Sequence, residues 1–144
     1  MLTNTDDPPL ILYTDGASRK NPGPAAIAYA IYDNSGQLVE KGAKCIGVHT
    51  NNEAEYEAIL WGLHKVTERR CTSVRAYLDS ELVVRQFTGQ YAAKKLTMAK
   101  YAERLAKYKE IFEDIELISV PRDNPRTQLV DSLVNEALDR ECGN

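Results

Sequence analysis

The chain has 144 residues, with 18 basic and 21 acidic side chains, a net charge of −3 and a pI of about 5.4. This length favours one domain over residues 1–144, with frayed ends at 1–8 and 141–144. The charge excludes a uniformly basic nucleic-acid binder. The sequence shows neither a membrane-helix run of roughly 20 apolar residues nor a signal-peptide pattern, so we expect a cytoplasmic protein without membrane contact. No apolar surface stripe indicates an oligomer, and we expect a monomer.

Hydrophobic patterning in chain order predicts five strands and four helices. The predicted strands are Leu10–Thr14, Ala26–Tyr32, Gln37–Val48, Val74–Leu78 and Ile115–Val120, and the predicted helices are Asn52–Arg69, Ser80–Phe87, Leu96–Phe112 and Pro125–Arg140. Asp33–Gly36 is a hairpin turn between the second and third strands. The order predicts an α/β fold, with a mixed sheet that begins as an antiparallel meander and continues through crossover helices.

The three cysteines, Cys45, Cys71 and Cys142, lie far apart and show no zinc-binding spacing. We favour free thiols in a reducing cytoplasm. A disulfide from Cys142 that ties down the end of the chain is the alternative.

Two acids stand where strands end. Asp15 closes the first predicted strand and Asp79 closes the fourth. If these strands are parallel neighbours, about 4.8 Å apart, the two carboxylates face the same small volume. Ligand sites in open α/β sheets form just beyond such strand ends.

Two helical acids are candidates for the same place. Glu55 lies on the apolar stripe of its helix, whereas Glu53 and Glu57 lie on the opposite side and are expected to be solvent acids. A buried carboxylate needs a proton, a hydrogen bond or a metal. Asp131 lies at the edge of an apolar stripe, where a surface acid favoured by the helix dipole is an equal alternative.

Carboxylates that converge without a lysine repel one another, so one holds a proton or a divalent cation neutralises them. Oxygen ligands favour Mg²⁺ or Mn²⁺ over zinc. Two such ions can flank a phosphodiester, one activating water and the other stabilising the leaving oxygen. A merely structural acid cluster is the alternative.

Four segments carry these acids in an order that resembles the motifs of type 1 ribonuclease H. They are Tyr13–Ser18 with Asn21–Pro24, Thr50–Tyr56, Leu78–Ser80, and Val120–Arg122 with Val130–Asn135. The resemblance implies a five-stranded mixed sheet with helices on both faces. It also implies catalytic, metal-binding roles for Asp15, Glu55, Asp79 and Asp131 with two Mg²⁺ ions, or Mn²⁺ as a substitute. The implied reaction is hydrolysis of the RNA strand of RNA–DNA hybrids, leaving 5′-phosphate and 3′-hydroxyl ends.

The same resemblance assigns substrate contacts. Asn21, Asn51 and Asn52 match positions that read the RNA 2′-hydroxyl, and Thr50 matches one that contacts a DNA phosphate. The alternative for the asparagines is turn and cap chemistry, with Asn52 capping its helix. Double-stranded RNA as a further substrate, and a catalytically silent binding module, are the competing functions.

The chain also departs from the family. The loop before Asp131 lacks the histidine that many members carry, and Arg122 fits a variant with arginine there. Because Arg122 precedes Asp131 by nine residues, a longer spacing than that variant suggests, Arg126 is a rival. The chain is too short for a separate hybrid-binding domain, and 89–96 is too brief for a long basic protrusion.

The net charge hides an uneven distribution. Residues 85–109 hold seven basic side chains against Glu103 alone, a local charge of +6, which leaves −9 elsewhere. We expect salt-sensitive hybrid binding through this segment, with contacts from Lys94, Lys95 and Lys100. A solvated helix face is the alternative.

Overall fold

The computed structural model describes residues 8–90, 92 and 95–142. Its elements are β1 (Leu10–Ser18), β2 (Gly23–Tyr32), β3 (Leu38–His49), α1 (Asn51–Glu68), β4 (Ser73–Leu78), α2 (Glu81–Phe87), α3 (Leu96–Ala106), α4 (Tyr108–Ile111), β5 (Asp114–Ser119) and α5 (Pro125–Arg140). Among these described helices, none is long and apolar enough to span a bilayer. The frayed ends predicted at residues 1–8 and 141–144 fall mostly on residues 1–7 and 143–144, which lie outside the described residues, so that prediction stays untested.

The five strands form one mixed sheet in the order β3-β2-β1-β4-β5. β1 pairs antiparallel with β2, and β2 with β3, whereas β4 runs parallel to both β1 and β5. The predicted meander and crossovers are therefore confirmed. β1 and β4 are neighbours, as the strand-end argument requires.

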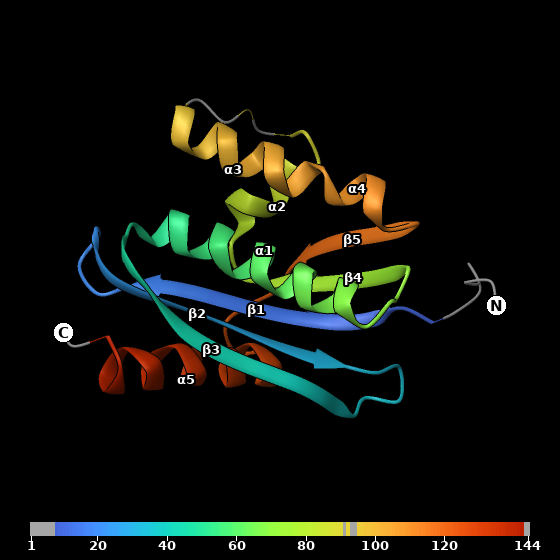
Figure 1. Cartoon of the computed structure of the whole chain (residues 1–144), viewed down its shortest axis with the longest axis horizontal. Coiled ribbons are helices and arrows are strands. Elements are labelled where there is room, and N and C mark those ends of the chain that lie inside the picture. The colour runs from blue at the N-terminus through green and yellow to red at the C-terminus, as the bar shows by residue number, and fades with distance from the viewer. Residues whose placement is uncertain (1–7, 91, 93–94, 143–144) are drawn as a thin grey trace.

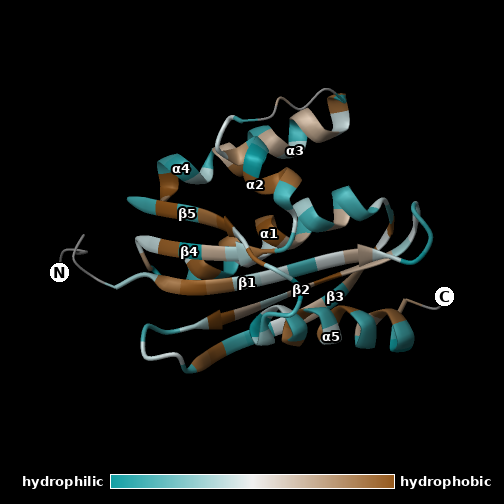
Figure 2. Ribbon diagram, turned by 180° about the vertical axis from the view of Figure 1, so that it is seen from behind, coloured by the Kyte–Doolittle hydropathy of each residue, from teal (hydrophilic) through white to brown (hydrophobic). Residues whose placement is uncertain are grey.

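Helices cover both faces of the sheet, as Figure 1 shows, with α1 to α4 on one side and α5 on the other. The strands alternate accordingly: Leu12 packs into the core beneath α1, and the next residue, Tyr13, into the core beneath α5. In Figure 2, hydrophobic and hydrophilic residues alternate along α5, as expected of a helix with one face on a sheet.

The first strand is longer than predicted, because pairing with β2 continues past Asp15 as far as Ser18 opposite Ala25. Pairing with β4 ends earlier, at Tyr13 opposite Tyr77. Asp15 therefore lies inside β1 but level with Asp79, two residues beyond that last parallel pair. The prediction that Asp15 closes the strand was wrong, whereas its position beyond the parallel part of the sheet holds.

Three of the predicted helices also differ, and for α2 the change is one residue, since it begins at Glu81 with Ser80 as its N-cap. The predicted helix 96–112 divides into α3 and α4 at Lys107, where bonding changes to a three-residue spacing between the Glu110 N–H and the Lys107 carbonyl (3.0 Å). α1 begins one residue early, and its N-cap is Thr50 rather than Asn52. Thr50 caps because its hydroxyl accepts from the Glu53 N–H while the Glu53 carboxylate accepts from the Thr50 N–H.

Cys45 on β3 and Cys142 after α5 form a disulfide, with Cα atoms 5.7 Å apart. The favoured interpretation of free thiols was wrong for this pair, because the packing of α5 across β3 brings together residues 97 positions apart. Cys71 is a free thiol and half-buried.

Candidate active site

The four predicted acids meet at one end of the sheet, each from a different element. Asp15 comes from β1, Asp79 follows β4, Glu55 projects from α1 and Asp131 from α5. Asp15 is only 8% exposed, and charge interactions link it to the other three. A small pit lined by Asp15, Glu55, Asp79 and Ser80 marks the place.

The local sequence explains why the acids approach. Asp15 and Asp79 continue the alternation of Tyr13 and Tyr77, whose stacked rings lie 5.0 Å apart on the α5 side of the sheet. Their carboxylates therefore face the side on which α5 supplies Asp131.

Glu55 arrives from the opposite side because α1 packs very closely on β1. A Cβ on Gly16 would lie 2.2 Å from the Ala54 carbonyl oxygen, so only glycine permits this approach. The residue after Ala54 is Glu55, which is thereby held over the end of the sheet. The prediction that Glu55 is the buried acid of its helix is consistent with this position.

Crowding changes the protonation of the central acid. Burial, and then the charges of Asp79, Asp131 and Glu55, raise the pKa of the Asp15 carboxyl to about 8, with a further contribution from a hydrogen bond with Asp131. Without a cation, Asp15 therefore holds a proton at neutral pH. Asp131, whose sequence pattern was ambiguous, thus belongs to the cluster rather than to an isolated helix surface.

Burial likewise raises the pKa of Glu55 to about 7, and the charge of Asp79 acts in the same direction, whereas a hydrogen bond from Ser80 opposes the shift. The Ser80 hydroxyl also accepts from the Val83 N–H (3.3 Å) as the N-cap of α2. Sequence reasoning did not single out Ser80. The available signal was its position between a strand-ending acid and a helix start.

Arg122 reaches the acids and Arg126 does not. The Arg122 Nε donates to Asp79 Oδ2 over 2.8 Å, from an otherwise exposed side chain. The Arg126 guanidinium lies 4.0 Å from the centroid of the Tyr32 ring, and its Nη2 donates to the Gly36 carbonyl (3.3 Å). Of the two rival arginines, the structure thus places Arg122 beside the carboxylates.

The donor set suits a hard divalent cation. Four carboxylates supply oxygen ligands alone. Without a cation, a proton on Asp15, the Arg122 guanidinium beside Asp79 and the Ser80 hydroxyl that bonds Glu55 relieve part of their repulsion. Over the described residues, no group of three or more acidic, histidine or cysteine side chains is already spaced to hold a metal. A bound cation would displace the proton that burial and the neighbouring charges place on Asp15.

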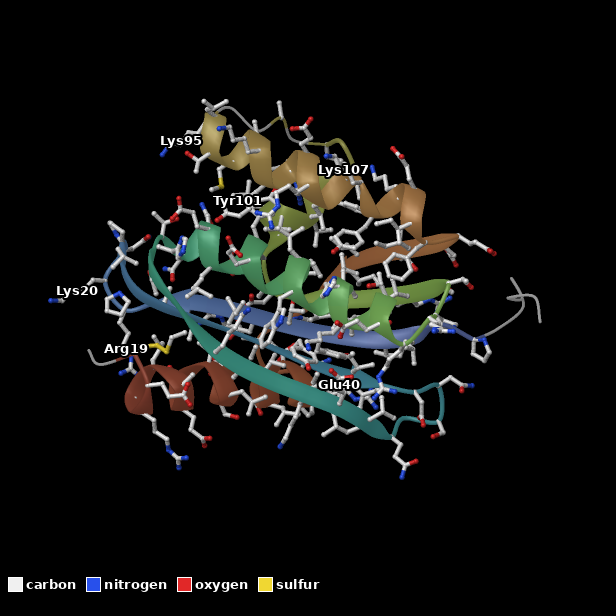
Figure 3. The ribbon with its side chains drawn as sticks, viewed as in Figure 1. Arg19, Lys20, Glu40, Lys95, Tyr101 and Lys107 are labelled. Atoms are coloured by element: carbon white, nitrogen blue, oxygen red, sulfur yellow. A yellow bond between two sulfur atoms is a disulfide. The ribbon has the colours of Figure 1, made fainter. Side chains whose placement is uncertain are left out.

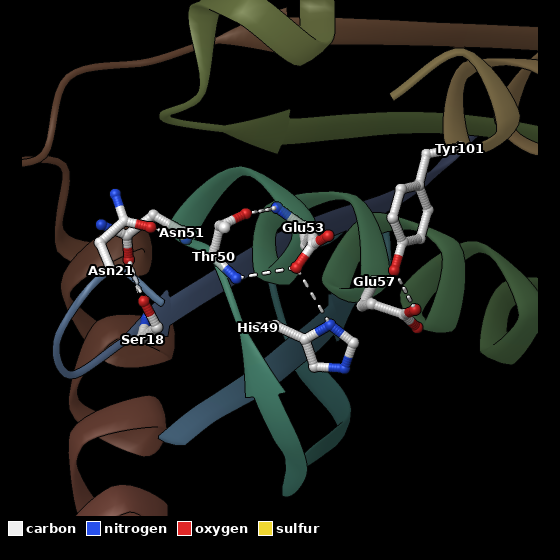
Figure 4. Close-up of polar contacts among 8 residues, drawn as sticks. All are labelled: Ser18, Asn21, His49, Thr50, Asn51, Glu53, Glu57 and Tyr101. Atoms are coloured by element: carbon white, nitrogen blue, oxygen red, sulfur yellow. Dashed lines mark hydrogen bonds and ion pairs between the residues drawn. The ribbon is translucent and has the colours of Figure 1, made fainter. Parts of the chain in front are cut away.

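A groove of about 400 Å³ beside the N-terminus of α1 brings together four of the predicted substrate residues, Asn21, Thr50, Asn52 and Lys95. Figure 4 shows the hydrogen bonds that shape this region. Asn51 holds the β1–β2 loop: its Oδ1 accepts from the Ser18 N–H (2.8 Å), and its own N–H donates to Asn21 Oδ1 (3.0 Å).

The remaining predicted contacts are more dispersed. Lys100 is exposed on α3 and does not line this groove, and Lys94 lies outside the described residues. Glu53 and Glu57 were wrongly predicted to be solvent acids. Glu53 belongs to the α1 capping box, and Glu57 accepts a hydrogen bond from the Tyr101 hydroxyl (2.6 Å).

Fold and site together define the ribonuclease H-like class: a β3-β2-β1-β4-β5 mixed sheet on which acids from β1, α1 and α5 meet the acid that follows β4. Residues 13–137 match the family model described as "Reverse transcriptase-like". The chain belongs to this family, and its resemblance to type 1 ribonuclease H is confirmed.

Individual relatives support the same family assignment. The chain is 35% identical to ribonuclease HI of Halobacterium salinarum over 88% of its length and 63% of the relative's. It is 33% identical to a bifunctional protein of Mycobacterium tuberculosis over 90% of its length and 35% of that protein's. The chain thus spans less than two thirds of these curated relatives.

Solved structures show the same fold. The crystal structure of RNase H1 from Halobacterium salinarum matches with a TM-score of 0.87 and 34% identity, over 92% of this chain and 98% of that one. LC11-RNase H1, solved in complex with an RNA/DNA hybrid, matches with a TM-score of 0.84 and 36% identity, over 90% of this chain and 96% of that one.

Proposed function

We propose that this chain is a ribonuclease H that hydrolyses the RNA strand of RNA–DNA hybrids, leaving 5′-phosphate and 3′-hydroxyl ends. The observation that carries the proposal is the convergence of Asp15, Glu55, Asp79 and Asp131, with the pKa values of Asp15 and Glu55 raised to about 8 and about 7. Carboxylates that repel one another strongly enough to raise their pKa values in this way are typical of a functional site rather than of a structural one. The similarity to a ribonuclease solved with a hybrid supports the substrate.

The four acids are the proposed ligands of two Mg²⁺ ions, with Mn²⁺ as a substitute. Such ions supply activation of the attacking water and stabilisation of the leaving oxygen. Asp15 and Glu55 would lose their protons if they held these ions, and Asp79 would have to leave its ion pair with Arg122. The single domain over residues 1–144 also remains our proposal.

Arg122 has the proposed role of contacting the phosphate near the acids. A guanidinium stays charged at any working pH, so it can neutralise a phosphate but cannot relay a proton. Released from Asp79, the exposed side chain is free to hold the 5′-phosphate as it forms. This role substitutes electrostatic attraction for the proton transfer of a loop histidine.

The groove at the N-terminus of α1 is the proposed hybrid contact. Asn21 and Asn52 offer amide donors and acceptors for a 2′-hydroxyl, and Thr50 and Lys95 suit a phosphate of the DNA strand. Asn51 supports this surface through its bonds to Ser18 and Asn21. Lys94 and Lys100 are proposed to add longer-range attraction from the basic segment.

The test compares the parent with Asp79→Asn on a labelled hybrid in Mg²⁺ and in Mn²⁺. Even outer partners of a metal site cost about 10- to 100-fold, so we expect the loss of a ligand to exceed 100-fold. Asp123→Asn, an exposed acid next to Arg122, is the matched control and should cleave like the parent. A parent that binds the hybrid without cutting it in either metal would overturn the proposal. The same assay with double-stranded RNA and with double-stranded DNA defines the substrate range.

We also propose a monomer in the cytoplasm. The exposed large apolar residues of the described chain are Leu38 and Val48, near opposite ends of β3, Leu96 on α3 and Ile111 on α4, and this scatter supports a monomer. Light scattering tests the first, and thiol trapping of Cys45 and Cys142 in cells tests the second, because a reducing compartment disfavours their disulfide.

A further inference from the structure

A second groove, of about 470 Å³, lies between α1, β3 and the α3–α4 segment, and none of the four acids lines it. We call it the α1/α3 groove. Its apolar floor includes Ile46, Leu60 and Trp61, and its rim includes Lys44, Arg104 and Lys107. The function proposed above leaves this groove without a role.

The rim is positively charged. Lys44, Arg104 and Lys107 come from β3, α3 and the α3–α4 junction, and all three are exposed. Within the part of the chain that the structure describes, none of them forms an ion pair with a carboxylate. The acid that lines the groove, Glu57, already accepts a hydrogen bond from Tyr101. Three cations around an apolar floor favour an anionic ligand that also has an apolar surface.

Trp61 gives the floor an aromatic surface. The Lys44 ammonium lies 4.5 Å from the centroid of its ring, and the Tyr29 ring contacts it edge-to-face at 4.8 Å. A nucleobase could replace the Lys44 ammonium over the indole, and the released ammonium could pair with the adjoining phosphate. Because the Lys44 side chain is exposed and flexible, moving its ammonium away from the indole costs little free energy.

The α1/α3 groove and the groove beside the N-terminus of α1 are both lined by residues of α1 and α3. Figure 3 shows Lys95 and Lys107 near opposite ends of α3, and Lys95 lines the other groove, beside Thr50 and Asn52. Along α1, Asn52 and Trp61 are nine residues apart, or about 14 Å at 1.5 Å per residue. That length corresponds to about four nucleotides of one strand at 3.4 Å each.

We propose that the α1/α3 groove binds a single-stranded extension of the DNA strand of the hybrid. Lys44, Arg104 and Lys107 pair with its phosphates, and Trp61 stacks on a base. The inference rests on the proposed hybrid binding near Thr50 and Lys95. Continuity along α3 favours nucleic acid over an acidic peptide, which is tested as the competing ligand.

The test uses a blunt hybrid and the same hybrid with eight thymidines added to the 5′ or the 3′ end of its DNA strand. Trp61 is the only tryptophan of the chain, so its fluorescence reports on the groove directly. We expect one extension to quench this fluorescence and to lower the Kd at least about fivefold, the lower limit for one stacked base. The salt dependence should steepen by about 0.7 for each phosphate contacted.

Lys44→Glu should abolish the gain from the extension while cleavage of the blunt hybrid stays within twofold of the parent. Lys41→Glu makes the same charge change on β3 outside the groove and should keep the gain. The inference is overturned if neither extension changes affinity or fluorescence, if both variants lose the gain equally, or if a glutamate-rich peptide quenches Trp61 and the extensions do not. Failure of the parent to cleave the blunt hybrid would instead refute the proposed function.

Discussion

Replacing Asp15 by asparagine tests whether the cation-free site holds unfavourable charge. Burial and three neighbouring carboxylates raise the pKa of Asp15 from 3.8 to about 8. The native state therefore keeps a proton that the unfolded chain loses above pH 4. Because the unfolded state then binds fewer protons, rising pH favours unfolding from about pH 4 to about pH 8. Asparagine has no proton to lose and escapes this penalty.

The size of the effect follows from the pKa shift. Each pKa unit is worth about 1.4 kcal/mol, so the advantage of Asp15→Asn should grow by at most about 4 kcal/mol between pH 4 and pH 7. Rearrangement of the cluster lowers this figure, and we expect about 2–4 kcal/mol. Glu55, with a pKa raised to about 7, adds a pH dependence of the same sign that both proteins share.

The assay is urea denaturation in a chelator at pH 4.5, 6 and 7.5. Asp15→Asn should gain stability over the parent as the pH rises, and Glu136→Gln, an exposed acid on α5, should not. Saturating Mg²⁺ should stabilise the parent most at the highest pH. A stability difference between Asp15→Asn and the parent that is constant across this range would refute the reasoning about protonation.

Three further predictions concern other parts of the structure. Gly16→Ala should cost about 3 kcal/mol in urea denaturation, because its Cβ would lie 2.2 Å from the Ala54 carbonyl oxygen; a loss below 0.5 kcal/mol contradicts this. Cys142→Ser should cost about 2–4 kcal/mol under oxidising conditions and nothing after reduction, whereas a loss that persists in reductant argues against the disulfide. Arg122→Gln should lower kcat about tenfold and tighten Mg²⁺ binding, with Arg126→Gln as the control; equal effects of the two would refute the assignment.

The positions of Asp15, Asp79 and Glu55 were predictable from periodicity, whereas Asp131 was assigned through the resemblance to type 1 ribonuclease H. Residues alternate along strands, and neighbouring parallel strands end together, which was enough to bring Asp15 level with Asp79. The helical repeat likewise separated Glu55 from the other acids of its helix. For Asp131, the same reasoning left a site acid and a surface acid equally favoured, because a residue at the edge of an apolar stripe can face the core or the solvent.

The features that sequence reasoning missed depend on tertiary contacts. Thr50 and Asn52 are both competent caps, and the reciprocal bond from Glu53 decides between them. The pairing of Cys45 with Cys142 follows only from the packing of α5 across β3. The seven basic residues between 85 and 109 predicted a single basic surface. In the structure, Lys95 and Lys107 line two different grooves.

The most direct test of the central claim identifies the strand that is cut and the ends that are left. A hybrid labelled on the RNA in one sample and on the DNA in another is incubated with the parent and Mg²⁺. We predict RNA fragments with 5′-phosphate and extendable 3′-hydroxyl ends, and an intact DNA strand. Intact RNA in both Mg²⁺ and Mn²⁺, or a cut DNA strand, would contradict the assignment of ribonuclease H activity to these four acids.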